Sequence, residues 1–363
     1  MTKYKSKIAM IIHSLTPGGM ERVMTELANY FSGFDNYEIH LVMFGRSPEC
    51  FYTLSENVFI HMPNSDFKDS FRIISSVKRL LFVRKKIKQI SPISILSFGI
   101  HWNNFVILSL MGLNYPIFVS ERGSPTRRYS LLQILLRKVL YQNTRGIIAQ
   151  TNVAKEITQK ILPTCHFKVI GNPIRGINKM DISNHRQNII LSVGRLITTK
   201  HHDRLINIFS KLIAPDWKLI IVGGDALKEK NKGKLQKLIR DLKLDRRVVL
   251  TGEQKDVDNY YLKGKIFAFT SSVEGFPNVI GEALSAGLPV VSYDCVAGPS
   301  EMITDGENGF LVPVFDDDLF LKKLQLLIDD EELRLKMSAN APASVEKYSI
   351  EKIGQQYLDF ILS

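Results

Sequence analysis

Short apolar runs alternate with helix-length amphipathic segments along the whole chain. In the first half, the runs 7–15 and 38–44 flank a helical pattern over 20–31. Runs bounded by Gly, Pro and Asn are typical of parallel strands covered on both faces. The second half repeats the scheme, with a helical pattern over 278–286. The other runs that we assign to strands are 93–98, 116–121, 145–151, 188–196, 218–224, 247–253, 266–272 and 289–294.

Two successive blocks of this kind predict an α/β fold of two doubly wound, Rossmann-like domains. The 363 residues also exceed what one hydrophobic core usually supports. The polar stretch 174–186 separates the blocks, so we predict domains over 1–175 and 176–348. The final segment, 349–363, is an amphipathic helix that either closes the second domain or crosses back to the first. A ligand is expected at the carboxyl ends of the strands, in the crevice between the domains.

Composition excludes several classes of protein. A content of 45% hydrophobic and 23% charged residues is ordinary for a globular chain. No apolar stretch approaches the ~20 residues that a membrane-spanning helix needs, and no secretory cleavage site follows the basic start. The widely spaced Cys50, Cys165 and Cys295 argue for a reducing cytosol. The lack of CxxC, HExxH, Walker A and complete GxGxxG motifs excludes zinc hydrolases, P-loop NTPases and the usual NAD site.

The net charge of +12 comes entirely from the first half of the chain. Residues 1–180 carry 24 Lys and Arg against 10 Asp and Glu. The stretches 68–88 and 122–145 interleave this charge with Phe, Ile, Leu and Val, a pattern typical of basic helices that lie on anionic lipid. A solvated helix face is the plainer alternative. Nucleic acid is a third, but no RNP, helix-turn-helix or zinc pattern supports it.

Charged residues follow two predicted strands of the second half. Arg195 and Lys200 stand at a strand end and before a helix, where two cations suit a diphosphate, although such a pair is usually surface charge. Glu274 lies in a strand-to-helix loop in which Gly275 lets a ligand approach the backbone. Glu282, eight residues on, can accept hydrogen bonds from two hydroxyls, as the acidic residue of dinucleotide sites does. The plainer interpretation is a helix cap and a solvated glutamate.

The segment 274–312, EGFPNVIGEALSAGLPVVSYDCVAGPSEMITDGENGFLV, resembles the signature of the retaining glycosyltransferases of family GT4, which have the GT-B fold. The motif GR-x4-K at 194–200 and the segment 18–22, GGMER, are similar to the same family. The likeness covers nearly the whole chain. It is greatest toward bacterial enzymes that extend lipid-linked O-antigen, capsule or N-glycan precursors.

The resemblance implies a role for each matching residue. Arg195 and Lys200 would neutralise the donor diphosphate, Glu274 would contact the donor sugar, and Glu282 would bind the ribose. It also implies that no metal and no other cofactor takes part in catalysis. The further donor contacts that it implies, mostly through backbone groups, are Gly18, Gly19, Phe276, Asn278 and Val279.

The chain departs from the family at one position. Many relatives carry His after the strand that we assign to 116–121, and by position Arg122 stands in its place. Arg122 would contact the donor sugar or an acceptor diphosphate; the alternative is an arginine paired with Glu121. His101 also follows a strand and is a second candidate contact, with a purely structural histidine as the alternative.

Together these observations predict a retaining, metal-independent hexosyltransferase. We expect it to move a hexose or N-acetylhexosamine from a nucleotide sugar, most simply a UDP-sugar, to a glycan on polyprenyl diphosphate, with an α-glycosidic bond. N-acetylgalactosamine, N-acetylglucosamine, galactose and glucose all remain open as donors. We expect the enzyme in the cytoplasm, peripheral on the inner membrane. The alternatives are a nucleotide-sugar epimerase, a phosphorylase with pyridoxal on a lysine, and a non-catalytic sugar- or lipid-binding module.

Overall fold

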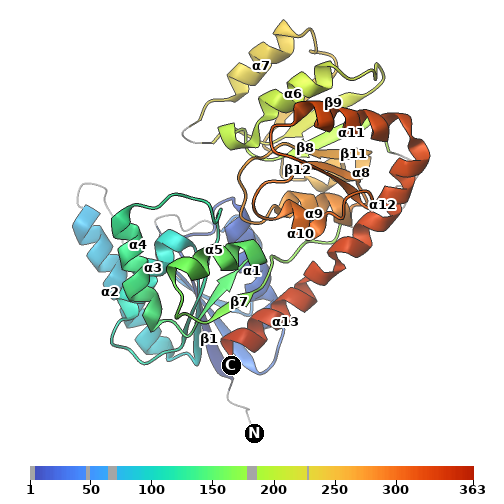
Figure 1. The fold of residues 1–363 in the computed structure, drawn as a ribbon. Coiled ribbons are helices and arrows are strands. Elements are labelled where there is room, and N and C mark those ends of the chain that lie inside the picture. The colour runs from blue at the N-terminus through green and yellow to red at the C-terminus, as the bar shows by residue number, and fades with distance from the viewer. Residues whose placement is uncertain (1–4, 46–49, 64–71, 178–185, 227–228) are drawn as a thin grey trace. The chain divides into compact units, whose positions relative to one another are not determined.

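The computed structural model of the protein describes residues 5–45, 50–63, 72–177, 186–226 and 229–363 (Figure 1). The chain divides into two compact units. Unit 1 comprises Met1–Pro173 and Ile350–Ser363, and unit 2 comprises Ile174–Ser349. Each is a parallel sheet with helices on both faces, so the predicted fold class is confirmed. The structure divides the chain two residues before, and one residue after, the boundaries expected from the sequence.

The sheet of unit 1 has seven parallel strands in the order β3-β2-β1-β4-β5-β6-β7. The strand order reverses between β1 and β4, which is where open α/β sheets bind ligands. Two outer strands, β3 and β7, escaped the sequence prediction. The bounds are β1 Ser6–Ile12, β2 Tyr37–Met43, β3 Val58–His61, β4 Ser94–Phe98, β5 Ile117–Ser120, β6 Gly146–Ala149 and β7 Phe167–Val169.

The helices of unit 1 cover both faces of this sheet. The α2, α3 and α4 helices pack on one face, where residues such as Val83 and Val106 meet Ile11 and Ile95. The α13 helix lies on the other face, where the Phe360 ring contacts the Phe118 ring of β5. The bounds are α1 Gly19–Ser32, α2 Arg72–Ile90, α3 Ile100–Leu110, α4 Leu131–Leu140, α5 Asn152–Ile161 and α13 Ile350–Ile361, with a short 3-10 turn, Tyr141–Asn143, after α4.

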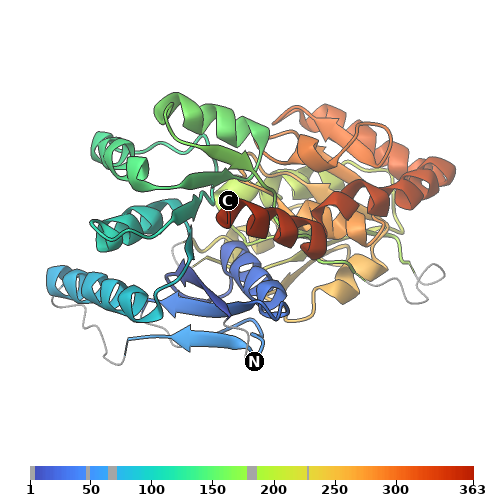
Figure 2. The ribbon, with the colours of Figure 1, turned by 90° about the horizontal axis from the view of Figure 1, so that it is seen from below.

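The last helix, α13, is thus part of unit 1, although unit 2 separates it in sequence from the rest of that unit. It runs beside α1 (Figure 2). Glycines allow this close packing: a Cβ on Gly354 would overlap the Tyr30 ring, and one on Gly146 would lie 2.5 Å from Phe360. Of the two positions expected for the final segment, the structure shows the one that crosses back to the first domain.

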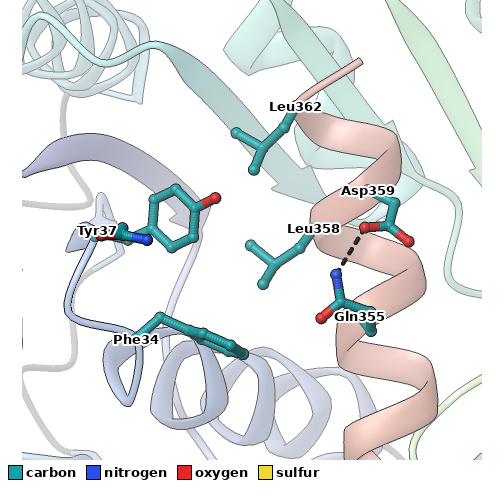
Figure 3. Close-up of a pocket in the computed structure, with 7 residues that line it drawn as sticks. Phe34, Tyr37, Gln355, Leu358, Asp359 and Leu362 are labelled. Carbon is teal, nitrogen blue, oxygen red and sulfur yellow. Dashed lines mark hydrogen bonds between the residues drawn. The ribbon is translucent and has the colours of Figure 1, made fainter.

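A pocket of about 380 Å³ lies between α13 and the α1–β2 turn (Figure 3). Phe34 and Tyr37 face Leu358 and Leu362 across it, and the Gln355 amide donates to Asp359 at 2.7 Å. The pocket lies at the amino end of the sheet, because Tyr37 begins β2. Within unit 1, it is therefore at the opposite edge of the sheet from the strand ends that precede His101 and Arg122.

Unit 2 has six parallel strands in the order β10-β9-β8-β11-β12-β13, with the reversal between β8 and β11. Its outer strand β13 was also not predicted. Helices α6, α7, α11 and α12 contribute to the core on one face. The strands are β8 Ile189–Val193, β9 Lys218–Val222, β10 Val248–Gly252, β11 Ile266–Phe269, β12 Val290–Tyr293 and β13 Gly309–Val312. The helices are α6 His202–Ser210, α7 Lys232–Asp241, α8 Asp258–Lys263, α9 Asn278–Ser285, α10 Pro299–Met302, α11 Asp317–Asp329 and α12 Glu331–Val345; 3-10 turns span Thr198–Lys200 and Glu346–Tyr348.

Candidate donor site and family

The reversal of strand order in unit 2 brings the predicted charged residues to one edge of the sheet. Gly194 and Arg195 come directly after β8, and Glu274 comes five residues after β11. Because β8 and β11 are parallel neighbours, their carboxyl ends meet at the same edge. Arg195 and Glu274, which are far apart in the sequence, therefore lie at the same edge of the sheet.

Lys200 and Glu274 form an ion pair at this edge. Lys200 Nζ lies 2.6 Å from Glu274 Oε1, with side-chain exposures of 17% and 13%. The same Nζ lies 4.9 Å from the centre of the Phe269 ring. The stem of Lys200 passes close to Gly194, where a Cβ would lie 3.4 Å from Cε. Arg195, which precedes Lys200 in the same loop, has an exposed side chain. This edge of the sheet therefore presents two cations to an anionic ligand.

A second glycine fixes the loop after β8. Gly223 follows β9 with φ of 152°, and a Cβ there would overlap the carbonyl of Gly194. The Gly194 amide donates to the Val222 carbonyl at 2.9 Å. Any larger residue at 223 would push away the backbone that carries Arg195.

Glu282 lies inside α9 and is buried, with 6% exposure. Its Oε2 accepts a hydrogen bond of 2.9 Å from the hydroxyl of Tyr261, which is fully buried on α8. The carboxylate is thus oriented from a neighbouring helix, and the plainer interpretation of a solvated glutamate is wrong. The sequence gave no sign of Tyr261, since its partner lies 21 residues away.

Contacts with other parts of unit 2 and within the loop itself hold the loop between Glu274 and α9. The Phe276 ring is buried and packs edge-on against Tyr348, 5.3 Å between centres. The Asn278 amide donates to the Phe276 carbonyl at 3.0 Å, and its contact with a donor stays a prediction. Gly298, with φ of 113°, lets the α10 turn approach this loop, because a Cβ would overlap Pro277. Val279 is partly exposed in the first turn of α9.

At the corresponding edge of unit 1, Gly18 and Gly19 begin α1. The Gly18 amide donates to the Tyr52 hydroxyl at 3.1 Å, and an approach of Gly18 and Gly19 to a diphosphate stays a prediction. That hydroxyl in turn donates to the Gly18 carbonyl at 2.9 Å. A Cβ on Gly18 would overlap the Glu21 carboxylate. Tyr52 therefore fixes the backbone at this helix start, a role that the sequence did not indicate.

Arg122 follows β5 and is tied to residues of its own unit. Its guanidinium donates to the Tyr357 hydroxyl of α13 at 2.6 Å and to the Asn172 side chain, and it lies 3.9 Å from the centre of the Phe98 ring. Burial lowers the pKa of this guanidinium. The expected alternative, a pair with Glu121, is wrong, because Glu121 pairs with Arg137 of α4.

His101 lies in the first turn of α3, and its side chain is outside the described residues. The neighbouring Trp102 stacks on His13, which follows β1, with ring centres 4.0 Å apart. A contact of His101 with substrate stays a prediction.

Two titratable groups near the Lys200–Glu274 pair are uncharged at neutral pH. Burial and the nearby Lys200 lower the pKa of His202 to about 4, so this imidazole is neutral. Burial and the Glu274 charge raise the pKa of Cys295 to about 12, so this thiol stays protonated. Across the described ranges, no three His, Cys, Asp or Glu side chains are grouped so that they could hold a metal ion.

Comparisons with known proteins identify a family for the chain. Residues 177–344 match the family described as glycosyl transferases group 1. An uncharacterized glycosyltransferase of Haemophilus influenzae is 30% identical over 97% of this chain and 98% of its own. A Campylobacter jejuni GalNAc-α-(1→4)-GalNAc-α-(1→3)-diNAcBac-PP-undecaprenol α-1,4-N-acetyl-D-galactosaminyltransferase is 26% identical over 98% of both chains.

A solved structure extends the likeness to the whole fold. Anabaena HepE in complex with UDP superposes with a TM-score of 0.79, at 19% identity, over 98% of both chains. Two parallel Rossmann-like sheets of this kind define the GT-B architecture that the resemblance had implied. On its sequence and its fold, the chain belongs to the group 1, GT4-like family of glycosyltransferases.

Proposed function

We propose that this glycosyltransferase moves a hexose or N-acetylhexosamine from a UDP-sugar to a glycan carried on polyprenyl diphosphate, with retention and an α-glycosidic product. The main observation in support of a nucleotide-sugar donor is the Lys200–Glu274 ion pair at the ends of β8 and β11. The UDP in the Anabaena HepE structure and the PP-undecaprenol acceptor in the Campylobacter jejuni relative's name support the choice of substrates. Such a reaction would serve cell-surface polysaccharide biosynthesis.

In this proposal the ion pair changes partners when the donor binds. A diphosphate carries more negative charge than one carboxylate, so it attracts the ammonium group of Lys200. The exposed guanidinium of Arg195 adds N–H groups that can bind two phosphate oxygens at once. The two cations would then stabilise the negative charge that grows on the leaving UDP. Glu274, released from Lys200, would accept hydrogen bonds from donor-sugar hydroxyls. Glu282, oriented by Tyr261, would accept hydrogen bonds from the ribose.

The same cations are our reason to propose catalysis without a metal ion. Two positive side chains supply the charge that a divalent cation would otherwise bring to the leaving group. Transfer should therefore persist in EDTA at the rate measured without it. A rate restored only by added Mg²⁺ or Mn²⁺ would contradict this part of the proposal.

Unit 1 is our candidate for the acceptor and membrane side. No helix in the described ranges is long and apolar enough to cross a bilayer. Exposed apolar side chains instead follow α2 and α4, which pack on the same face of the sheet. Leu131 is 86% exposed and Ile73 is 81% exposed. The others are Ile74, Val77 and Leu81 of α2 and Leu132, Leu135, Leu136 and Val139 of α4.

Basic residues accompany this apolar surface, although fewer than the sequence pattern indicated. Lys78, Lys85, Lys88 and Lys138 are exposed. Arg137 is buried, and Arg84 donates to the carbonyls of Ser109 and Met111. Residues 68–71 of the predicted basic stretch lie outside the described residues. Leucines flanked by lysines suit an anionic lipid surface, and we place the enzyme on the cytoplasmic face of the inner membrane.

Vesicle sedimentation tests the membrane part. The protein should bind phosphatidylglycerol vesicles at low salt, and the Leu131→Ser, Leu135→Ser variant should bind several-fold less. Ile213→Ser in unit 2 is a matched control, because Ile213 is 83% exposed but lies on the other unit. Equal binding by all three proteins, or none by the wild type, would remove this surface from the proposal.

The decisive experiment is a donor panel. Thermal melting with UDP, GDP, ADP and UDP-sugars should show stabilisation by UDP and one UDP-sugar, lost in Arg195→Ala and Lys200→Ala. Product NMR with that donor and a polyprenyl-diphosphate glycan should then show an α-anomeric linkage. A UDP-sugar converted without acceptor would indicate an epimerase, and binding without turnover would indicate a non-catalytic module.

A further inference from the structure

Hydroxyl groups tie together the two segments that carry Lys200 and Glu274. Thr270, Ser271 and Ser272 directly follow β11. Thr270 Oγ1 donates to the Lys200 carbonyl at 2.9 Å and lies 3.2 Å from that of His201. The Thr199 carbonyl accepts from Ser271 Oγ at 3.2 Å and from the Ser272 amide at 3.0 Å. Three consecutive residues therefore hold three consecutive carbonyls of the loop after β8.

The backbone at His201 is shaped for this arrangement. With φ of 50° and ψ of 42°, His201 adopts the left-handed conformation, which is sparsely populated by residues other than glycine. It stands between the Thr198–Lys200 turn and α6. Its Nε2 lies 2.8 Å from Ser272 Oγ, and its ring meets the Phe315 ring edge-on. Such a conformation persists only where the surroundings hold it, and here Thr270 and Ser272 do so.

Lys200 is consequently fixed at both ends by one short segment. Thr270 holds its carbonyl, and Glu274, four residues later, holds its Nζ. Thr270 is only 2% exposed, so its hydroxyl hydrogen bonds are sheltered from water. When a diphosphate draws the Nζ away from Glu274, the hydroxyl bond would still hold the backbone of Lys200 in place.

We propose that Thr270 and His201 are positioning residues for diphosphate recognition: they hold the backbone of Lys200 where its ammonium group reaches the leaving nucleoside diphosphate. This inference rests on the role given to Lys200 in the proposed function. It adds that the strength of donor binding depends on a buried hydroxyl, that of Thr270, and on both the left-handed backbone and the ring of His201.

Thr270→Val is the first test, because it removes the hydroxyl and keeps the shape. Loss of one hydrogen bond that places a charged group should lower kcat/KM for the UDP-sugar about 5- to 10-fold. Thr144→Val is the matched control, since Thr144 Oγ1 donates to the Tyr141 carbonyl at 2.7 Å within unit 1. Both variants should melt within a few degrees of each other, and only Thr270→Val should lose activity. Ser272→Ala, which removes only the bond to the His201 ring, is the second variant should Thr270→Val fold poorly.

The double variant Thr270→Val, Lys200→Ala tests whether Thr270 acts through Lys200 or lowers activity independently of it. If Thr270 acts through Lys200, Thr270→Val should cause no further loss of kcat/KM in the Lys200→Ala background. An equal further loss in that background would overturn the inference. Full activity of Lys200→Ala alone would instead contradict the proposed function, so the two failures are distinguishable.

His201→Gly tests the second residue. Glycine accepts the left-handed backbone without strain but lacks the ring that bonds Ser272. Relief of the left-handed strain offsets the loss of the ring contacts, so we expect a melting temperature within a few degrees of the wild type together with a several-fold lower kcat/KM for the donor. Unchanged kcat/KM would exclude His201 as a positioning residue.

Discussion

Two ion pairs occupy comparable places in the two units, each just beyond the carboxyl end of a strand, and they are built differently. In unit 1, Glu121 follows β5 and pairs with Arg137; the side chains are 9% and 3% exposed. In unit 2, Glu274 pairs with Lys200. Glu121 also accepts from the Thr158 hydroxyl at 3.1 Å, and Arg137 lies against the Tyr129 ring. The first pair is surrounded by further partners on both sides.

The difference indicates what each pair is suited to do. A guanidinium and a carboxylate held by several neighbours in a buried place resist exchange of partners. A lysine is a point charge on a flexible stem, so it can leave a carboxylate for a stronger anion. The pair in unit 1 is therefore suited to hold its fold, whereas the pair in unit 2 is suited to meet a ligand.

The largest effect that we expect comes from neutralising the unit 2 carboxylate. Glu274→Gln keeps the volume of the side chain and a carbonyl oxygen for Lys200, but it removes the charge. The turnover number for sugar transfer should fall about 100-fold or more, as for removal of one well-placed polar group in an active site. Steady-state kinetics and a melting curve check this together. Wild-type turnover would show that the pair is structural, like its counterpart.

The reverse result is expected in unit 1. Arg137→Leu leaves the Glu121 charge buried without its main partner, which should cost about 3 kcal/mol of unfolding free energy. Urea denaturation measures that loss. Transfer activity per folded molecule should stay within about twofold of the wild type. The double variant Arg137→Leu, Glu121→Gln is the control, and it should regain part of the stability because no buried charge remains.

Acid should act on unit 2 through His202. Its pKa is about 4 in the folded protein and near 6.5 when unfolded, so the unfolded chain binds more protons between these values. Stability is then complete above pH 6.5 and falls on the order of 2 kcal/mol by pH 5. His202→Leu should reduce this slope. His61 of unit 1, with a pKa also lowered to about 4, should still contribute, so an unchanged total slope is the contradicting result.

The smallest effect is expected at Tyr261, which orients Glu282 without meeting the ligand. Tyr261→Phe removes one hydrogen bond and should weaken UDP binding several-fold, equivalent to about 1 kcal/mol. Calorimetry with UDP and 2′-deoxy- and 3′-deoxy-UDP sharpens the test. The wild type should prefer UDP over at least one deoxy analogue, and the variant should show less of that preference. An equal preference in both proteins would mean that Tyr261 only packs.

Sequence patterns located the central strands and the edge strand β10, but they missed the other three edge strands. β1 and β8 are buried on both faces, so their apolar runs are continuous. The unpredicted β3, β7 and β13 are the outermost strands of their sheets, of three or four residues each. β3 and β7 are short and partly exposed, and β13 is mostly buried but has only four residues, so each leaves little apolar periodicity to detect.

In the candidate site, too, the sequence indicated residues in local motifs but not the contacts between distant elements. Arg195, Lys200 and Glu274 follow predicted strand ends, and the resemblance to the family implied their roles. The sequence did not single out Thr270, because this polar residue directly after an apolar run falls within the predicted strand 266–272. Partners from other elements were hidden as well: Arg137 lies 16 residues from Glu121, whereas the adjacent Arg122 was the apparent partner. Pairings across elements come from folding and not from local pattern.

The return of α13 to unit 1 has a consequence for biosynthesis and for engineering. Residues 174–349 form one uninterrupted segment, so unit 2 can fold on the ribosome while unit 1 still waits for its last helix. Tyr357 on that helix is also the partner that Arg122 needs. A chimaera that exchanges unit 1 must therefore carry two segments, before residue 174 and after residue 349. A single crossover would join a domain to the wrong final helix.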